Sequence, residues 1–224
     1  MDWEPLRLSL LVASAGLGLA MFVGIALGLL LALGRWRGRD VLEVAVTAPL
    51  ILPPTVLGYY VLVALGRSSP LGRAWESLTG GPLVFSVSGC IFAAALAALP
   101  FIVKATRSAV EEVDPGLLDA AATLGASPWR RLFTILLPLA RRGIAGGCML
   151  GFAKALGDFG VTLMIAGNIP GSTRTASLAI YDHLLAGRDG QAAGLALILT
   201  AIGMSLLWVV NRSVRPQRTR EAAT

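Results

Sequence analysis

Five long hydrophobic stretches divide this chain. They cover residues 8–34, 44–66, 84–103, 143–166 and 192–211, and polar or charged segments separate them. A helix needs about 20 apolar residues to cross a hydrocarbon core of about 30 Å, and each stretch reaches that length. The pattern therefore predicts an all-α polytopic membrane protein with five transmembrane helices, built as one membrane domain over residues 1–224.

The composition agrees with this pattern. The 224 residues are 55% hydrophobic and 14% charged, with a mean hydropathy of +0.73, whereas soluble domains carry about 25% charged residues. The cysteines Cys90 and Cys148 lack the spacing of metal ligands, and His183 is the only histidine. We therefore expect no metal and no cofactor on this chain.

Basic residues are unevenly distributed between the segments that separate the hydrophobic stretches. Positive residues concentrate on the cytoplasmic side of membrane proteins, so we expect the N-terminus outside and the C-terminus in the cytoplasm. The excess of basic residues in these segments then reflects membrane topology rather than binding to nucleic acid. Thirteen of the 19 basic residues lie in the segments assigned to the cytoplasm, namely Arg35, Arg37, Arg39, Lys104, Arg107, Arg130, Arg131, Arg141, Arg142, Arg212, Arg215, Arg218 and Arg220.

A polar insert interrupts the hydrophobic pattern in the cytoplasmic loop predicted at 104–142. Asp114 followed by Pro115 is typical of a helix start, and Gly125 of a helix end. These signals predict a short helix over 115–124, and Ser127-Pro128 then starts a second helix that continues into the membrane. The insert is either a surface helix that only connects two spans or a docking element for a cytoplasmic partner.

The residues of this insert resemble the signature loop of ABC importer permeases, E-A-A-x3-G-x9-I-x-L-P. The resemblance implies the type I ABC importer permease fold, with a coupling helix that docks on a separate ATP-hydrolysing subunit, present in two copies. The first position differs, because Asp replaces Glu and shortens the reach of the carboxylate. The matching residues are Asp119, Ala120, Ala121, Gly125, Ile135, Leu137 and Pro138.

An absent motif supports this interpretation. The chain contains no G-x-x-x-x-G-K-[S/T] phosphate loop, and neither of its two lysines, Lys104 and Lys154, follows a glycine. The chain is therefore not expected to hydrolyse ATP or to be an enzyme.

Two further segments, 50–67 and 154–181, resemble the molybdate branch of these permeases. This implies import of molybdate or tungstate by alternating access across a bacterial inner membrane, with sulfate or thiosulfate import as the alternative. The family also implies a second permease chain in a homodimer and an extracytoplasmic molybdate-binding protein.

Ionisable residues inside the fourth stretch are candidates for the translocation pathway. Lys154 lies about 16 Å past Gly143, near the membrane midplane, and Asp158 is expected on the same helical face. A charge at this depth needs a partner or a wet cavity, so the pair either neutralises itself within the bundle or lines the pathway. A short segment after Asp158 is a candidate for re-entry into the membrane.

The second stretch carries prolines that are expected to kink it where the backbone lines a cavity. Pro53, Pro54, Thr55 and Tyr59 are the pathway candidates there, although the tyrosine is also typical of a membrane interface.

Two remaining features concern protein contacts. In the loop 168–191, Asn168 and Arg174 are candidates for the surface that receives the binding protein. Glycines recur every four residues at 143, 147 and 151, a spacing that lets helices approach closely. Such faces serve packing within one chain more often than dimerisation.

Overall fold

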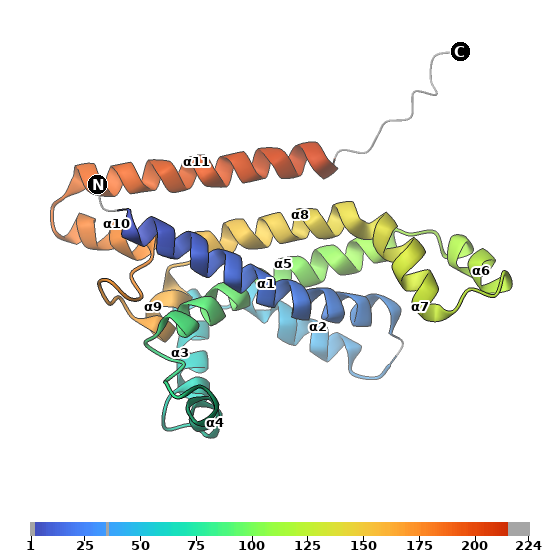
Figure 1. Cartoon of the computed structure of the whole chain (residues 1–224), viewed down its shortest axis with the longest axis horizontal. Helices are drawn as coiled ribbons and strands as arrows, with labels where there is room; N and C mark the ends of the chain where they lie inside the picture. The colour runs from blue at the N-terminus through green and yellow to red at the C-terminus, as the bar shows by residue number, and fades with distance from the viewer. Residues whose placement is uncertain (1–2, 35, 215–224) are drawn as a thin grey trace, which may run out of the picture.

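The computed structural model describes residues 3–34 and 36–214, and every regular element in these residues is a helix. The helices run mostly along one axis, with α6 and α7 at one end of the bundle and α9 and α10 at the other (Figure 1). We refer to these as the α6 end and the α10 end. Four basic residues used to predict topology, Arg35, Arg215, Arg218 and Arg220, lie outside the described residues.

Three long helices form the centre of the bundle: α1 (Glu4–Leu33), α5 (Val87–Glu111) and α8 (Leu137–Leu156). Most glycines of α1 and α8 lie against α5. A Cβ on Gly28 would meet Thr106, and a Cβ on Gly143 or Gly147 would overlap Ala109 or Ala105. The small-residue face of residues 143–151 therefore packs within this chain, where it brings α8 close to α5.

The second hydrophobic stretch is not one helix. It consists of α2 (Arg39–Thr47), the short 3-10 helix η1 (Ala48–Leu50) and α3 (Pro54–Leu65), with a bend of 115° between the two halves. The predicted kink is thus a break, because the proline rings restrict the backbone and Pro53 and Pro54 lack amide donors. Together with α4 (Pro70–Thr79), α3 extends sideways from the bundle (Figure 1).

The fourth hydrophobic stretch also differs from its predicted bounds. A helical segment begins at Pro128 as α7 (Pro128–Arg131), passes through a π-helical turn η2 (Leu132–Leu136) and continues as α8. It ends at Leu156, and α9 (Gly160–Ala166) follows after a break at 157–159. At seven residues, α9 is about 10 Å long and too short to cross a membrane.

The last two helices are α10 (Ala176–Leu185) and α11 (Asp189–Val214), and α11 runs alongside α8 from the α10 end. By length and hydropathy, the described residues contain four helices able to cross a membrane, or five if the bent pair counts as one span. The predicted loop at 104–142 is shorter in the structure, because α5 extends to Glu111 and α7 begins at Pro128.

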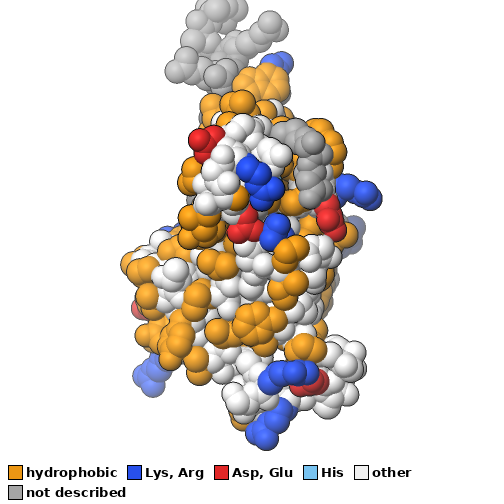
Figure 2. Space-filling model, turned by 90° about the vertical axis from the view of Figure 1, so that its left-hand side faces the viewer, with side chains coloured by type: hydrophobic (Ala, Val, Ile, Leu, Met, Phe, Trp, Pro, Cys, Tyr) orange, Lys and Arg blue, Asp and Glu red, His pale blue; other side chains and the backbone are white. Residues whose placement is uncertain are grey.

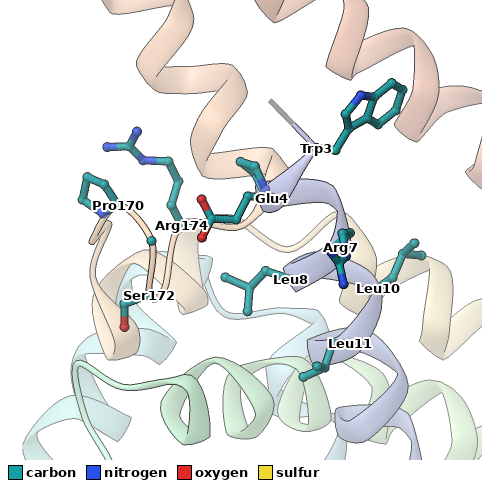
Figure 3. A pocket seen from close by; sticks show the side chains of 11 residues that line it. Trp3, Glu4, Arg7, Leu8, Leu10, Leu11, Pro170, Ser172 and Arg174 are labelled. Carbon is teal, nitrogen blue, oxygen red and sulfur yellow. The ribbon is translucent and has the colours of Figure 1, made fainter. Parts of the chain in front are cut away.

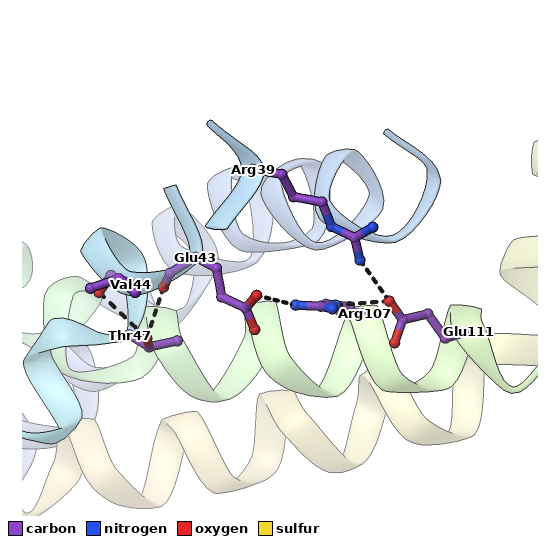
Figure 4. A network of polar contacts seen from close by, with 6 residues as sticks. All are labelled: Arg39, Glu43, Val44, Thr47, Arg107 and Glu111. Atoms are coloured by element: carbon purple, nitrogen blue, oxygen red, sulfur yellow. Dashed lines mark hydrogen bonds and ion pairs between the residues drawn. The ribbon is translucent and has the colours of Figure 1, made fainter. Parts of the chain in front are cut away.

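A cluster of four charged residues, Arg39, Glu43, Arg107 and Glu111, fastens α2 to α5 (Figure 4). The Arg107 guanidinium forms ion pairs with Glu43 of α2 and, at 2.8 Å, with Glu111 of its own helix. Arg39 reaches Glu111 at 3.0 Å. This arginine–glutamate cluster contains equal numbers of positive and negative groups, so it links the two helices without adding net charge.

Candidate functional site

The segment between α5 and α8 begins with the short helix α6 (Pro115–Thr123), whose ends are closed as the sequence predicts. The Asp114 carboxylate accepts a hydrogen bond from the Gly116 amide at 2.8 Å, which caps the N-terminus. Gly125 has a φ of +81°, and the amides of Gly125 and Ala126 donate to the carbonyls of Ala122 and Ala121. This paired arrangement is a Schellman motif, which a residue with positive φ completes.

The α6–α7 segment (residues 114–131) exposes large apolar side chains. Leu124 is 88% exposed and Trp129 71%, and no residue of α6 is buried. The segment is nevertheless fixed to the bundle, since Leu118 packs on the core. Within the segment, the Leu118 carbonyl accepts from Arg131 Nη1 at 3.5 Å, which ties α6 to α7. An ordered apolar surface of this kind is typical of a protein interaction site.

The signature residues occupy different layers of this segment. Asp119 and Ala120 are exposed on α6, and Ala121 is half-buried. Because Asp114 caps α6, Asp119 is not the residue that starts the helix. Ile135 lies in the π-helical turn η2, whereas Leu137 and Pro138 open α8. The signature thus connects an exposed helix to the start of a long helix in the bundle.

Lys154 and Asp158 do not lie on one helix, so their predicted common helical face is wrong. Lys154 is near the end of α8, whereas Asp158 lies in the break that follows Leu156. The Asp158 carboxylate is buried and accepts hydrogen bonds from the Thr162 amide at 2.9 Å and the Thr162 hydroxyl at 2.8 Å. Helix α8 ends at Leu156 because these two hydrogen bonds hold Asp158 at the start of α9.

The two charged groups are still neighbours. Lys154 Nζ lies 3.9 Å from Asp158 Oδ1, and the lysine side chain is 45% exposed while the aspartate is 2% exposed. Ser177 of α10 donates to the backbone carbonyl of Asp158 at 2.7 Å. Asp158 is therefore a fixed structural anion, and Lys154 is an accessible cation beside it.

The break in the second stretch presents an exposed polar and aromatic face. Pro53 precedes α3 and Pro54 is its first residue, while Thr55 and Tyr59 are exposed on the helix that follows. On its other side, α3 packs tightly on α9. A Cβ on Gly58 would meet the Met164 side chain. The described residues leave the Thr55–Tyr59 face of α3 without a partner in this chain.

The loop after α9 holds the two predicted docking residues, and both make contacts within the chain. Asn168 Nδ2 donates to Asp182 Oδ1 at 2.7 Å. Arg174 Nε lies 3.0 Å from Asp182 Oδ2 and 3.2 Å from Asn168 Oδ1. Asp182, which orients both side chains from α10, is not among the docking candidates selected from the sequence.

A groove of about 880 Å³ lies beside this loop, where it meets the first turns of α1 (Figure 3). Ser9 of α1 joins the two walls, because its hydroxyl accepts from the Ala176 amide at 2.7 Å. Seen from the α10 end, charged side chains of both signs lie among hydrophobic ones (Figure 2). Residues lining this groove include Trp3, Glu4, Arg7, Leu8, Leu11, Pro170, Ser172 and Arg174.

Lys104 has a place that the sequence did not predict. Hydropathy assigned it to the cytoplasmic loop, but it lies within α5, seven residues before the helix ends at Glu111. Its side chain is exposed. The signal that would have found it is the unbroken helical pattern after residue 103, which contains no glycine or proline up to Asp114.

Comparison with known proteins agrees with this architecture. The family model described as "binding-protein-dependent transport system inner membrane component" matches residues 24–218. The molybdenum transport system permease protein ModB of Azotobacter vinelandii is 39% identical over 214 residues, covering 96% of this chain and 95% of the relative. ModB of Escherichia coli (strain K12) is 39% identical over 220 residues, covering 98% and 96%.

Solved structures of ABC transporters share the fold. A chain of a bacterial alginate ABC transporter aligns with a TM-score of 0.73 at 17% identity, covering 95% of this chain and 77% of its own. A chain of the MetNI methionine ABC transporter, in an inward-facing conformation, gives 0.68 at 17% identity, covering 96% and 100%. The chain belongs to the family of binding-protein-dependent transport system inner membrane components.

Proposed function

We propose that this chain is the membrane-spanning subunit of an ATP-driven importer of molybdate or the closely similar tungstate. The observation that carries this proposal is the 39% identity to two ModB permeases along nearly the whole of both chains. Because the chain lacks a phosphate-binding loop, a separate ATPase subunit supplies the energy. The subunit itself needs no cofactor for this role.

The proposed topology places the α6 end in the cytoplasm and the α10 end outside, with five crossings and the bent pair α2–α3 counted as one. Arg107, Arg130, Arg131, Arg141 and Arg142 all lie towards the α6 end, in keeping with the cytoplasmic excess of basic residues. The N-terminus is then extracytoplasmic, and the groove between α1 and the 168–175 loop faces the binding protein.

In this arrangement α6 is the coupling helix, one for each of two ATPase subunits. The exposed Leu117 on α6 and Leu124 at its C-terminal cap supply apolar contact area, and Asp119 supplies a charge. The helical segment from Pro128 to Leu156 begins beside α6 and ends near Lys154. A displacement of α6 is therefore passed along a rigid helix to the membrane interior.

The permease works as a homodimer with its pathway between the two chains. The ATPase favours one of two packings of the dimer by contacting α6 differently in each, so the pathway opens alternately to the two sides. An oxyanion contacts the exposed Lys154, Thr55 and Tyr59 only in passing. Affinity resides in the binding protein, because a pathway that held a dianion tightly would release it slowly.

The test is uptake into proteoliposomes that contain the permease with its cognate ATPase and binding protein. We expect ATP-dependent uptake of molybdate and tungstate, with little competition from a large excess of sulfate. Vesicles without ATP and vesicles without the binding protein are the controls. Sulfate uptake in the absence of molybdate and tungstate uptake would refute the substrate assignment while leaving the permease assignment intact.

A further inference from the structure

Lys104 is an exposed cation within a long helix of the bundle. It lies about 10 Å along α5 from the helix end at Glu111. It forms no ion pair or hydrogen bond with any residue that the structure describes. A charged side chain at such a position in a membrane helix is expected to face a partner or a water-filled path.

The carboxylates of the arginine–glutamate cluster and of the end of α5 already have other partners. Glu43 and Glu111 are held by the guanidinium groups of Arg107 and Arg39 in the arginine–glutamate cluster (Figure 4). Glu112 lies two helical turns further on and accepts from the Ser108 hydroxyl at 3.3 Å. The positive charge of Lys104 is therefore not balanced by the acidic residues of its own helix end.

The orientation of Lys104 follows from the packing of α5. Ile102 and Thr106 face α1, where they lie against Gly24 and Gly28. Lys104 is two residues from each of them, which turns it about 200° around the helix axis and away from α1. Its exposure shows that α2, α8 and α9 leave this side of α5 uncovered at this level.

Lys154 is the exposed lysine of α8. It lies seven residues after Gly147, so it shares the face of α8 that contacts α5. The buried residues Ile144, Cys148 and Ala155 point instead into the core shared with α1. The contact of Gly151 with Ala98 gives a common level on the antiparallel helices α8 and α5. Lys154 and Lys104 lie on opposite sides of this level, about 13 Å apart along the bundle axis.

We propose that Lys104 is a second cationic contact for the transported oxyanion, on the half of the pathway nearer the α6 end. This inference rests on the proposed function and extends it. Lys154 is partly neutralised by Asp158, whereas Lys104 has no such partner. A dianion that leaves Lys154 is therefore attracted more strongly by Lys104, which lies further along the pathway. This difference favours its passage towards the cytoplasm.

The first test measures initial molybdate uptake in proteoliposomes that contain the complete transporter. Lys104→Met is expected to lower the rate about tenfold, because a lost unit charge in a wet site changes the interaction with a dianion by roughly that factor. Lys104→Arg is expected to retain most of the rate. Arg73→Met, an equal charge change at an exposed position on α4, is the matched control and should match the wild type.

The possible outcomes distinguish a failure of this inference from a failure of the proposed function. If the wild-type complex imports no molybdate, the proposed function fails. If the wild type imports molybdate and Lys104→Met imports it equally fast, the inference about Lys104 fails. Stimulation of ATP hydrolysis by the loaded binding protein should survive in Lys104→Met, and its loss would assign Lys104 to coupling instead of to the pathway.

A second test asks whether residue 104 meets water or lipid. Lys104→Cys should react with a membrane-impermeant, charged thiol reagent supplied from the α6 side, and saturating molybdate should slow the reaction. The wild type is the blank, since Cys90 and Cys148 are buried. Leu197→Cys, on an exposed apolar side of α11, should not react. A Lys104→Cys variant as unreactive as Leu197→Cys would place the residue in lipid and overturn the proposal.

Discussion

Gly147 on α8 faces Ala105 on α5 so closely that a Cβ on the glycine would overlap the Cβ of the alanine. The backbone carbonyl of Phe101 lies on the same side, about one turn earlier in α5. This contact sets the distance between the two helices that carry Lys104 and Lys154. The spacing of these two helices thus depends on residue 147 being a glycine, which lacks the methyl group of alanine.

Gly147→Ala is therefore expected to destabilise the protein in spite of the higher helix propensity of alanine. Overpacking of a tight interface costs about 1–3 kcal/mol, which exceeds the gain of about 1 kcal/mol from replacing a helical glycine. Gly203→Ala on α11 is the control, because a Cβ there meets nothing within 4 Å. Thermal unfolding in detergent should show a lower midpoint for Gly147→Ala only, and equal midpoints would contradict the packing argument.

The role of Asp119 can be separated from that of Asp114. Asp119→Asn should weaken co-purification of the ATPase, because it removes from α6 an exposed charge that has no partner among the described residues. Asp119→Glu keeps the charge and should co-purify with the ATPase as the wild type does. Asp114→Asn removes a charge from the same segment but keeps the helix cap, since Asn caps as well as Asp. Equal ATPase recovery with all three variants would remove Asp119 from the docking surface.

Arg107 is expected to contribute more to stability than Arg39, although both belong to the arginine–glutamate cluster. Arg107→Gln leaves Glu43 without its ion-pair partner and breaks one of the two ion-pair links between α2 and α5, at a cost of about 1–2 kcal/mol. Arg39→Gln removes one partly exposed ion pair and should cost less than about 1 kcal/mol. Unfolding midpoints at low and high salt measure both effects, and the difference should shrink as salt screens the charges.

Local signals in the sequence predicted local structure well. Asp114, Gly125 and Ser127 begin or end helices through hydrogen bonds to residues two to five positions away, so their neighbours in sequence are sufficient. Hydropathy likewise located the long helices. It placed Lys104 in a loop because an apolar run ends at the first charge, whereas the helix continues to Glu111.

Features that depend on contacts between distant segments were not predictable in the same way. The end of α8 at Leu156 depends on Asp158, whose carboxylate bonds Thr162 and whose carbonyl accepts from Ser177. Asn168 and Arg174 point towards Asp182 only because α10 folds back beside the loop. The size of the bend before α3 depends on its packing against α9, which the prolines alone do not specify.

The separate surroundings of Lys154 and Asp158 lead to the last prediction. Lys154→Met should lower molybdate uptake about tenfold at unchanged membrane abundance, because the side chain is exposed and its removal leaves α8 intact. Asp158→Asn should instead reduce abundance and the unfolding midpoint. Its carboxylate is buried and holds the start of α9, and a weakened charged hydrogen bond of this kind costs about 1.5–3 kcal/mol.

The double variant Lys154→Met, Asp158→Asn distinguishes a pathway lysine from a lysine that only neutralises Asp158. If neutralisation is the role of Lys154, losing both charges should restore the uptake per molecule of permease. If Lys154 contacts the oxyanion, uptake per molecule of permease stays low in the double variant. Quantitative immunoblotting of membranes together with initial uptake rates gives both values, and full recovery of uptake would remove Lys154 from the pathway.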